Sequence, residues 1–380
     1  MKIACISTAQ LPSIKANSIQ VMKVCQALVQ NGEDVSLYVP GTVPVSWEEL
    51  ADYYGLIDPF PVIQVKFRRL FKRMDFTLAS LRDARIKQVD LVYTRMLWVA
   101  FLARLRGLPV VLELHDLPGG RFGPTIYRRF LRFEKPKLTV YITSALKQLA
   151  DANLGVQARE GEFLVAPDGV DLERFQDLPD PPRARALLGL EETTTAVYSG
   201  GFYAGRGLDI MQQLALVFPQ VQFLWIGGTP EQVNEWSGRL STAGVRNVKL
   251  TGFIPNAKLP SYQAAADVLL MPYSLAFGGS GGGDIAAVSS PMKLFEYMAA
   301  GRSILASDLP VLREVLNDRN AAFYQPENFP DLCAKFAVLI SNVSMRKKLA
   351  AAAQEDVKAF SWRTRMAVII NIMKGLIEKK

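Results

Sequence analysis

Four short segments place glycines or polar side chains at the end of an apolar run, where α/β proteins commonly bind their ligands. They are residues 199–207, residues 289–301, the pair His115-Asp116 and the pair Asn17-Ser18. Their residue types are glycine, arginine, lysine, carboxylates and short polar side chains. Arginine, lysine and backbone amides bind phosphate, and carboxylates bind sugar hydroxyls. The chemistry to consider is therefore the binding of a phosphorylated or sugar-bearing ligand.

Residues 199–207 read Ser-Gly-Gly-Phe-Tyr-Ala-Gly-Arg-Gly and directly precede a helical pattern. Glycines let the backbone approach an anion, and the amides at a helix N-terminus carry partial positive charge. Arg206 can bind a phosphate through two parallel hydrogen bonds. For this segment alone, a tight strand-to-helix turn with a surface arginine is the alternative.

Residues 289–301 contain Lys293 and Glu296, three positions apart in a helix that Pro291 is expected to begin. Both side chains then lie on one face, where an ammonium and a carboxylate can bind a phosphate and a sugar diol. A surface ion pair is the alternative. The preceding loop carries five glycines within residues 278–283, which favours a segment that covers a substrate.

His115, the single histidine of the chain, ends the apolar strand pattern Val-Val-Leu-Glu-Leu. A zinc site or a Ser-His triad is poorly supported, because neither a second histidine nor a cysteine lies nearby in the sequence. A structural histidine is the alternative. Asn17 and Ser18 lie at the first strand-to-helix junction, where they can hold a phosphate or a sugar. Ser18 can instead cap the helix, and the two roles are compatible.

Alternating strand and helix patterns must position these segments. Helical spacing covers residues 18–30, 207–218 and 259–266. Strands are expected at residues 2–8, 34–40, 89–95, 109–116, 138–144, 194–201, 221–228, 248–254, 267–273, 301–308 and 320–325. Residues 168–190, rich in Pro, Asp and Arg, separate the two series. We therefore predict two doubly wound α/β domains divided near residue 171, with a ligand in the cleft between them.

Composition indicates a globular protein, since 49% of the 380 residues are hydrophobic and 21% are charged. This excludes disordered, collagen-like and low-complexity classes. No apolar stretch reaches the ~18 residues of a membrane-spanning helix, and no secretory signal is expected. Cys5, Cys25 and Cys333 are expected to be buried thiols of a reducing compartment. We expect a cytoplasmic protein.

The net charge of +8 is unevenly distributed. Residues 66–137 contain 17 basic and 6 acidic residues, whereas residues 171–380 contain 22 and 20. The basic segment favours a polyanionic partner such as an anionic membrane leaflet, a phosphosugar or a nucleic acid; a solvated face is the alternative. A nucleic-acid-binding protein and a dinucleotide-dependent oxidoreductase are disfavoured, because neither class's motif is present.

Taken in order, these segments resemble the retaining GT-B glycosyltransferases of family 4 over nearly the whole chain. The resemblance rests on residues 16–28 (ANSIQVMKVCQAL), 166–175 (APDGVDLERF), 199–207, 250–255 (LTGFIP) and above all 290–316, which begin SPMKLFEYMAAG. It implies two Rossmann-like domains that face each other across a cleft. Residues 1–170 plus 362–380 would bind the acceptor, and residues 171–361 the nucleotide sugar. A last helix that stays on the second domain is the alternative.

The resemblance also implies roles for residues of the second domain. Arg206 and Lys293 would hold the donor diphosphate, and Glu296 the ribose hydroxyls. Backbone around Phe253 and Ile254 would contact the base, and Leu294 would lie beside the ribose or phosphate.

In the first domain, Asn17 and Ser18 replace a Gly-Gly pair and would bind the donor, and His115 would lie near the transferred sugar. His115, Arg206 and Lys293 are the expected catalytic residues. Two features depart from the family. Its usual first acid, eight positions before Glu296, is replaced by Val288, for which Asp284 could substitute. The other departure is Gly201, which stands where relatives often have a basic residue.

The implied reaction moves a hexosyl group, with retention, from a nucleotide diphosphate to a hydroxyl of a lipid-linked or glycan acceptor. A UDP-sugar is the favoured donor. Fixed cations and helix amides would stabilise the departing diphosphate. We expect neither a metal nor a cofactor, because no Asp-x-Asp motif is suitably placed. A non-catalytic protein that binds nucleotide sugars or polyanions is the alternative, motivated by the missing first acid.

Two basic segments of the first domain, residues 66–76 and 120–137, mix Phe and Leu with Arg and Lys. Such segments lie at the surface of anionic membranes in many peripheral proteins. We therefore expect peripheral contact with the inner face of a membrane, and no nucleic-acid partner.

Overall fold

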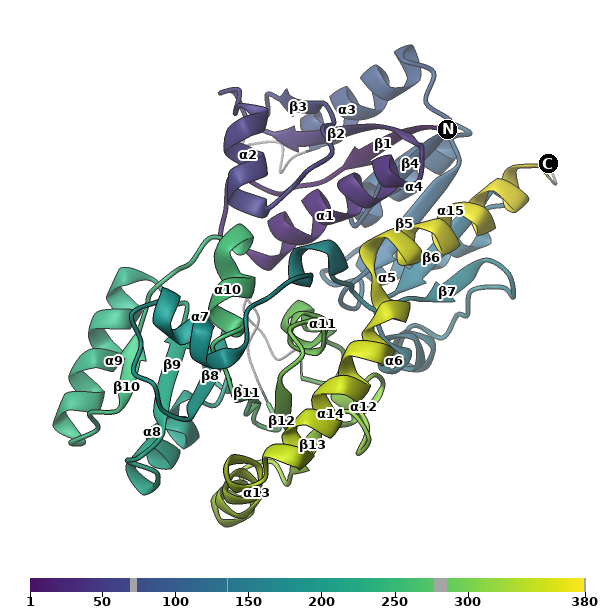
Figure 1. The fold of residues 1–380 in the computed structure, drawn as a ribbon. Helices are drawn as coiled ribbons and strands as arrows, with labels where there is room; N and C mark the ends of the chain where they lie inside the picture. The colour runs from purple at the N-terminus through teal and green to yellow at the C-terminus, as the bar shows by residue number, and fades with distance from the viewer. Residues whose placement is uncertain (69–73, 135, 277–285, 379–380) are drawn as a thin grey trace. The chain divides into compact units, whose positions relative to one another are not determined.

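The chain folds into two α/β units, each built on its own parallel sheet (Figure 1). The computed structural model describes all residues except 69–73, 135, 277–285 and 379–380. Unit 1 consists of Met1–Asp168 and Trp362–Lys380, and unit 2 of Gly169–Ser361. The sequence had predicted domain boundaries after residues 170 and 361.

The sheet of unit 1 has the order β3-β2-β1-β4-β5-β6-β7, with every neighbouring pair parallel. Apart from the exposed Lys2, the residues of β1, β4, β5 and β6 are buried and mostly apolar, as expected for strands covered on both faces. The strands are β1 (Lys2–Ile6), β2 (Asp34–Pro40), β3 (Val62–Val65), β4 (Leu91–Thr94), β5 (Val110–Leu114), β6 (Lys137–Tyr141) and β7 (Phe163–Val165).

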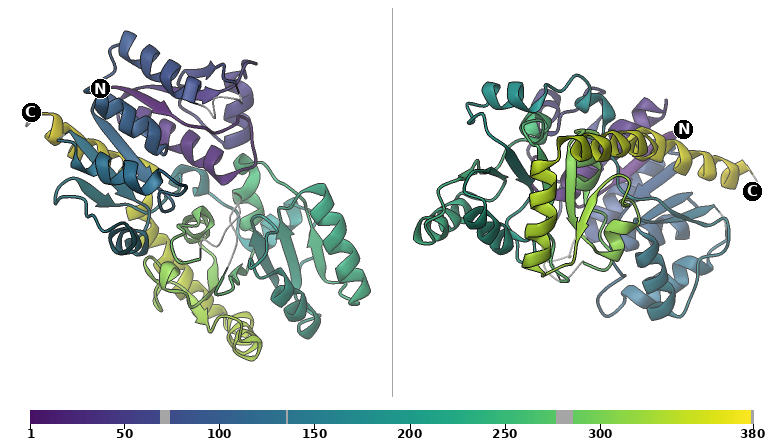
Figure 2. Two further views of the ribbon diagram at one scale, coloured as in Figure 1. Left: turned by 180° about the vertical axis from the view of Figure 1, so that it is seen from behind. Right: turned by 60° about the horizontal axis from the view of Figure 1, so that its bottom comes forward.

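Helices cover both faces of this sheet. On one face α1 and α15 lie side by side, although they come from opposite ends of the chain (Figures 1 and 2). The helices are α1 (Ala16–Gln30), α2 (Trp47–Tyr54), α3 (Met74–Ile86), α4 (Leu97–Leu105), α5 (Gly123–Arg132), α6 (Ser144–Leu154) and α15 (Trp362–Glu378).

The sheet of unit 2 has the order β10-β9-β8-β11-β12-β13 and is also parallel. Its strands are β8 (Thr195–Ser199), β9 (Gln222–Ile226), β10 (Val248–Leu250), β11 (Val268–Met271), β12 (Ser303–Ser307) and β13 (Ala322–Tyr324). Its helices are α7 (Pro181–Leu187), α8 (Leu208–Val217), α9 (Pro230–Thr242), α10 (Leu259–Gln263), α11 (Met292–Ala299), α12 (Pro310–Arg313), α13 (Phe329–Ser341) and α14 (Val343–Asp356). Two apolar clusters of buried residues pack around the sheet.

The strand orders explain where ligands can bind. In each sheet the order reverses at one point, between β1 and β4 in unit 1 and between β8 and β11 in unit 2. The crevice outside the carboxyl ends of strands at such a point is the usual ligand site of a doubly wound sheet. All four segments singled out in the sequence follow a strand of one of these sheets, which places them at the carboxyl edges.

Candidate functional site

In unit 2, the candidate site is centred on Lys293, whose Nζ is buried. It lies in the first turn of α11, and its Nζ is 3.9 Å from the ring centroid of Tyr198 and 5.2 Å from that of Tyr273. Arg206 lies 4.7 Å from the same Tyr273 ring. Among the described residues, none offers a hydrogen-bond acceptor to the buried Nζ. Two cations thus share an aromatic environment, and the described residues give Lys293 no hydrogen-bonded partner.

Electrostatics at Lys293 favour the arrival of an anion. Burial lowers the pKa of Lys293 well below its ordinary value, and the positive charge of Arg206 lowers this pKa further. The carboxylate of Glu296 acts in the opposite direction. An anionic ligand beside Nζ would relieve both unfavourable effects, because it would balance the charge and accept hydrogen bonds.

Two glycines of the 199–207 loop lie so close to neighbouring atoms that a side chain would not fit there. A Cβ at Gly200, where φ is +147°, would lie 2.5 Å from Lys293 Nζ, so a side chain there would displace the ammonium. Gly207, with φ of +83°, precedes the first residue of α8, and its Cβ would lie 1.9 Å from the Pro272 carbonyl oxygen. The loop therefore packs tightly against Lys293 and against the residue after β11.

Glu296 is oriented by two buried amides. Asn256 Nδ2 donates to Oε1 and Gln263 Nε2 donates to Oε2, each at 3.3 Å. Arg174 in turn donates to the side-chain and backbone oxygens of Asn256. The described residues contain no Lys293–Glu296 ion pair, so the surface-pair alternative is not what this helix shows. The carboxylate is held as an acceptor for hydroxyl groups.

The remaining predicted donor residues of unit 2 have different surroundings. Phe253 is 38% exposed, whereas Leu294 is buried in the apolar core. Ile254 packs partly buried against the same core, and the Gly201 carbonyl accepts a hydrogen bond from Tyr198 at 2.9 Å. Asp284 and the glycines at 278–283 lie outside the described residues.

In unit 1, His115 follows β5 and belongs to a buried cluster of charges. Its Nε2 is 2.5 Å from Oε1 of Glu113, which is fully buried. Arg365, from α15, donates to Oε2 of Glu113 at 2.9 Å. Sequence reasoning missed both Glu113 and Arg365. The available signal was a carboxylate inside an apolar strand, because charged residues are seldom fully buried unless paired.

Burial dominates the protonation of His115. It lowers the pKa of the imidazole to about 4, with a further lowering from Arg95, while Glu113 opposes the shift. Burial would raise the pKa of Glu113, but Arg365 and His115 reverse this and hold it well below its ordinary range. Near neutral pH the site therefore contains a neutral imidazole beside an ionised carboxylate.

Glu113, His115 and Asp168 offer ligand atoms within 4.8 Å of one another, a spacing that a metal ion could use. The oxygens of Glu113 already accept hydrogen bonds from Gln20, Tyr93, His115 and Arg365. A cation at this position would also face the guanidinium of Arg365. The donor set therefore fits a hydrogen-bonded network better than a metal site.

Asn17 and Ser18 lie inside α1, which begins at Ala16. Ser18 is buried, and its hydroxyl donates to the Gln10 carbonyl at 3.0 Å and contacts Asn17 Oδ1 at 3.4 Å. The alternative that Ser18 caps the helix is wrong, because the N-cap position is Lys15, whose side chain makes no capping hydrogen bond. Asn17 is half-buried at the start of the helix.

Comparisons with known proteins support the family that the sequence resembles. Residues 18–174 match the family described as "Glycosyltransferase Family 4", and residues 194–342 match "Glycosyl transferases group 1". The chain belongs to the family 4 glycosyltransferases. The matched regions include Ser18 and His115 in unit 1, and Arg206, Lys293 and Glu296 in unit 2.

Relatives of this glycosyltransferase span most of its length at low identity. A phosphatidyl-myo-inositol mannosyltransferase of Mycolicibacterium smegmatis is 25% identical over 364 residues, covering 93% of this chain and 88% of the relative. A protein of the same name from Mycobacterium tuberculosis is 26% identical over 276 residues, covering 70% and 67%. The structure of Anabaena HepE in complex with UDP superposes with a TM-score of 0.74 at 18% identity, over 99% of this chain and all of HepE. The glycosyltransferase has the GT-B fold.

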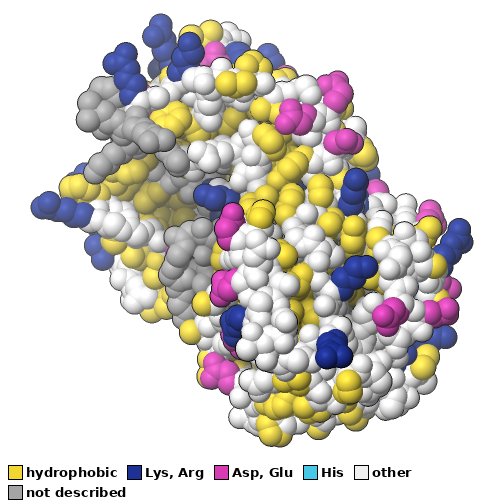
Figure 3. All heavy atoms as spheres, turned by 90° about the vertical axis from the view of Figure 1, so that its left-hand side faces the viewer, with side chains coloured by type: hydrophobic (Ala, Val, Ile, Leu, Met, Phe, Trp, Pro, Cys, Tyr) yellow, Lys and Arg dark blue, Asp and Glu magenta, His cyan; other side chains and the backbone are white. Residues whose placement is uncertain are grey.

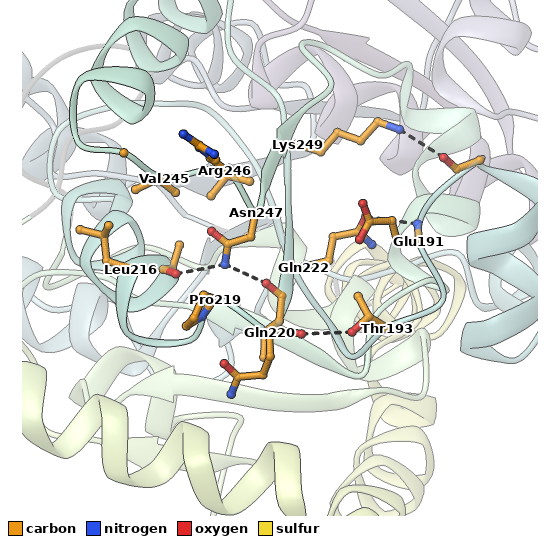
Figure 4. A pocket seen from close by; sticks show the side chains of 15 residues that line it. Glu191, Thr193, Leu216, Pro219, Gln220, Gln222, Val245, Arg246, Asn247 and Lys249 are labelled. Carbon is orange, nitrogen blue, oxygen red and sulfur yellow. Dashed lines mark hydrogen bonds between the residues drawn. The ribbon is translucent and has the colours of Figure 1, made fainter.

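The glycosyltransferase also has a cavity of about 650 Å³ in unit 2 (Figure 4). Its lining residues, among them Thr193, Gln222 and Asn247, stand just before or at the start of β8, β9 and β10. This cavity therefore lies at the amino edge of the sheet, opposite the edge that carries Lys293. Asn247 fills part of it with three hydrogen bonds to backbone carbonyls.

The surface of the glycosyltransferase bears on the membrane prediction. The apolar residues of α5 are buried, and Arg128, Arg129 and Arg132 are exposed on its other face. Phe122, just before this helix, is 59% exposed. Part of the other basic segment, residues 69–73, lies outside the described residues. On the face drawn in Figure 3, acidic and basic side chains are interspersed with hydrophobic ones. Among the described residues, no helix is long and apolar enough to span a bilayer.

Proposed function

We propose that this glycosyltransferase transfers a hexosyl group from a UDP-sugar, with retention, to a hydroxyl of a lipid-linked or glycan acceptor. Unit 2 would bind the donor and unit 1 the acceptor. The observation that carries the proposal is the Lys293 ammonium, buried beside Arg206 without a hydrogen-bond acceptor among the described residues. A diphosphate would supply both the missing acceptor and the missing negative charge.

Each donor residue has a distinct part in this proposal. Lys293 and Arg206 would bind the diphosphate, and their charge would stabilise it as it leaves. Glu296, held by Asn256 and Gln263, would accept hydrogen bonds from the ribose hydroxyls. The HepE structure contains UDP at a site of the same fold, which supports uridine as the base.

The acceptor class and the retaining outcome rest on relatives. Several are named phosphatidyl-myo-inositol mannosyltransferase, which supports a lipid-linked acceptor with a polyol head group. Retention would follow from attack on the side of the leaving group, with the diphosphate taking the proton from the acceptor hydroxyl.

Metal independence is part of the proposal, because Lys293 and Arg206 supply the positive charge that a divalent ion supplies in other transferases. Activity should then persist after treatment with EDTA. Loss of activity in EDTA that Mg²⁺ or Mn²⁺ restores would overturn this part alone.

Thermal stability with nucleotides tests the donor class. UDP, GDP and ADP are added separately to the wild type and to Glu296→Ala and Lys249→Met. Lys249 is the matched control, because it lies at the amino edge of the same sheet. We expect UDP to raise the melting temperature of the wild type and of Lys249→Met, and to do so less in Glu296→Ala. Equal responses to all three nucleotides in all variants would refute the assignment.

A second candidate is a protein that binds nucleotide sugars without transferring the sugar. Val288, which is buried, occupies the position of the family's first acid and favours this alternative. Binding of UDP without transfer or hydrolysis of any UDP-sugar would support it.

Sedimentation with vesicles that contain or lack anionic lipid tests the proposed peripheral membrane contact, with Arg128→Glu/Arg129→Glu as the variant. Equal sedimentation with both kinds of vesicle would remove the membrane proposal.

A further inference from the structure

Arg365 connects the last helix of the chain to the only histidine. It is buried, and it donates to Oε2 of Glu113 at 2.9 Å and to the carbonyl oxygens of Pro167 and Ala166 at 2.6 and 3.1 Å. The pairing spans 252 positions in the sequence. All of these residues belong to unit 1. The guanidinium therefore has one fixed orientation, set by the segment before the unit boundary and by β5.

The Glu113 carboxylate is oriented from several sides. Gln20 of α1 donates to Oε1 at 2.5 Å, and Tyr93 of β4 donates to Oε2. Both oxygens are thereby occupied by donors that come from different elements, and the carboxylate cannot rotate without breaking several hydrogen bonds. His115 Nε2 contacts Oε1 at 2.5 Å. An ionised carboxylate has only acceptor atoms, so His115 must be the donor in this contact.

Donation from Nε2 decides the tautomer of His115. In a neutral imidazole one nitrogen carries the proton and the other carries a lone pair. With the proton on Nε2, Nδ1 is the acceptor. His115 stands immediately after β5, at the carboxyl edge where doubly wound sheets bind their ligands.

We propose that Arg365 is a positioning residue: by holding the Glu113 carboxylate, it fixes His115 as the Nε2–H tautomer and presents Nδ1 as a hydrogen-bond acceptor to a substrate hydroxyl. Glu113 acts in the same way, through His115. The identity of the hydroxyl, on the sugar or on the acceptor, rests on the proposed function. The tautomer and its dependence on Arg365 do not.

Charged groups around the imidazole of His115 act on its protonation in opposite directions. Glu113 and Asp168 have carboxylate oxygens within 4.8 Å of a ring nitrogen, Arg95 and Arg365 act on its pKa, and the Tyr93 hydroxyl donates to the same Glu113 carboxylate. The two guanidinium groups disfavour an imidazolium, and Glu113 favours one. Removing Arg365 takes away positive charge, so we expect protonation of His115 to become easier and its pKa to rise.

The single histidine makes a direct measurement possible. In protein labelled with ¹⁵N-histidine and carrying no histidine tag, long-range ¹H–¹⁵N correlation spectra report the two ring nitrogens of His115 alone. We expect the wild type to show the neutral Nε2–H tautomer across the neutral pH range. A neutral Nδ1–H tautomer, or an equal mixture of the two, would overturn the proposal whether or not the protein transfers sugar.

Variants then test Arg365 itself. Arg365→Met should give a mixture of tautomers and a raised His115 pKa, and Arg365→Lys should restore the wild-type spectrum in part. Glu113→Gln should lose the single tautomer as well, and it keeps the proposal testable if Arg365→Met does not fold. Lys374→Met is the matched control, because Lys374 lies on the same helix and pairs with Glu33 at 2.8 Å. It should leave the spectrum unchanged.

Kinetics supply the readout that a merely structural role would not give. If the donor is a UDP-sugar, Arg365→Met should lower kcat by between about 10- and 100-fold with KM for the donor within about twofold. The acid limb of its pH profile should move toward neutrality. Equal loss of kcat in Lys374→Met, or a wild-type spectrum in Arg365→Met, would show that Arg365 only stabilises the helix.

Discussion

Replacing Lys293 by methionine should keep or raise the stability of the ligand-free protein and should weaken ligand binding. Methionine has nearly the same length and removes only the charge and the hydrogen-bond donors. A buried donor without an acceptor costs about 1–3 kcal/mol. Contact of the ammonium with the Tyr198 and Tyr273 rings offsets about 0.5–2 kcal/mol of this. The ligand-free variant should therefore be as stable as the wild type or more stable by about 1–2 kcal/mol.

Calorimetry of the melting transition measures both effects. For a unit of this size, 1 kcal/mol corresponds to roughly 2–4 °C, so Lys293→Met should melt at the wild-type temperature or up to about 8 °C higher. UDP at roughly 100-fold above its Kd stabilises by about 2.7 kcal/mol, equivalent to roughly 5–10 °C in the wild type. We expect Lys293→Met to lose most of that increase, and Lys249→Met to keep it.

The pH dependence of the same melting transition independently tests whether the buried Lys293 lowers the stability of the ligand-free protein. Since the native pKa of Lys293 lies below its ordinary value of 10.5, the unfolded chain binds this proton more tightly than the native protein. Stability should rise with pH between the lowered native pKa and 10.5, and Lys293→Met should lack that rise. A clearly less stable ligand-free variant, or an undiminished response to UDP, would refute the reasoning.

Three further substitutions test other parts of the structure. Gly207→Ala should destabilise unit 2 by about 2 kcal/mol or more in thermal melting, because φ at Gly207 is +83° and the new Cβ would clash with Pro272. The control is Gly238→Ala in α9, where an added Cβ has no atom within 4 Å, and it should be neutral or stabilising. Asn256→Ala should weaken UDP binding about tenfold in titration calorimetry and leave pyrophosphate binding unchanged, since Asn256 orients Glu296 and not Lys293; equal losses for both ligands would contradict this. Burial raises the pKa of Asp168 to about 7, so its folded state favours the protonated form and stability falls as pH rises from its ordinary value of 3.8 through about 7. Asp168→Asn should therefore gain melting temperature relative to the wild type at about pH 8 more than at about pH 4, and an equal difference at both would count against it.

Local patterns in the sequence predicted the elements and the edge of the sheet that carries each candidate residue. Lys293 and Glu296 were placed together because they are three apart in a helix, and α11 contains both. The pattern could not supply their partners. Tyr198, Asn256 and Gln263 come from other elements, and only the packed sheet brings them to α11.

Unit 1 shows the same limit more clearly. Glu113 lies two positions before His115, yet its importance depends on Arg365, 252 positions later. No local periodicity encodes such a pair, because α15 returns to α1 only after unit 2 is complete. The error at Ser18 has a local cause: the helix begins at Ala16, two residues earlier, so the serine lies within its first turn. Asp284 stays a prediction, as do the roles of the other donor residues.

Buried charged residues in this protein differ in whether other residues of the chain hydrogen-bond to them. This difference distinguishes residues that stabilise the fold from a residue that binds a ligand. Lys137 is paired with Glu162 and the Phe133 carbonyl, and Arg365 with Glu113 and two carbonyls. Both are satisfied within the chain, so their charges stabilise the fold only as long as the partner stays. The Nζ of Lys293 is also buried, and the described residues give it no such acceptor. A buried ammonium without an acceptor lowers the stability of the fold until an external anion binds to it. A residue that is retained in spite of this loss of stability is expected to serve binding.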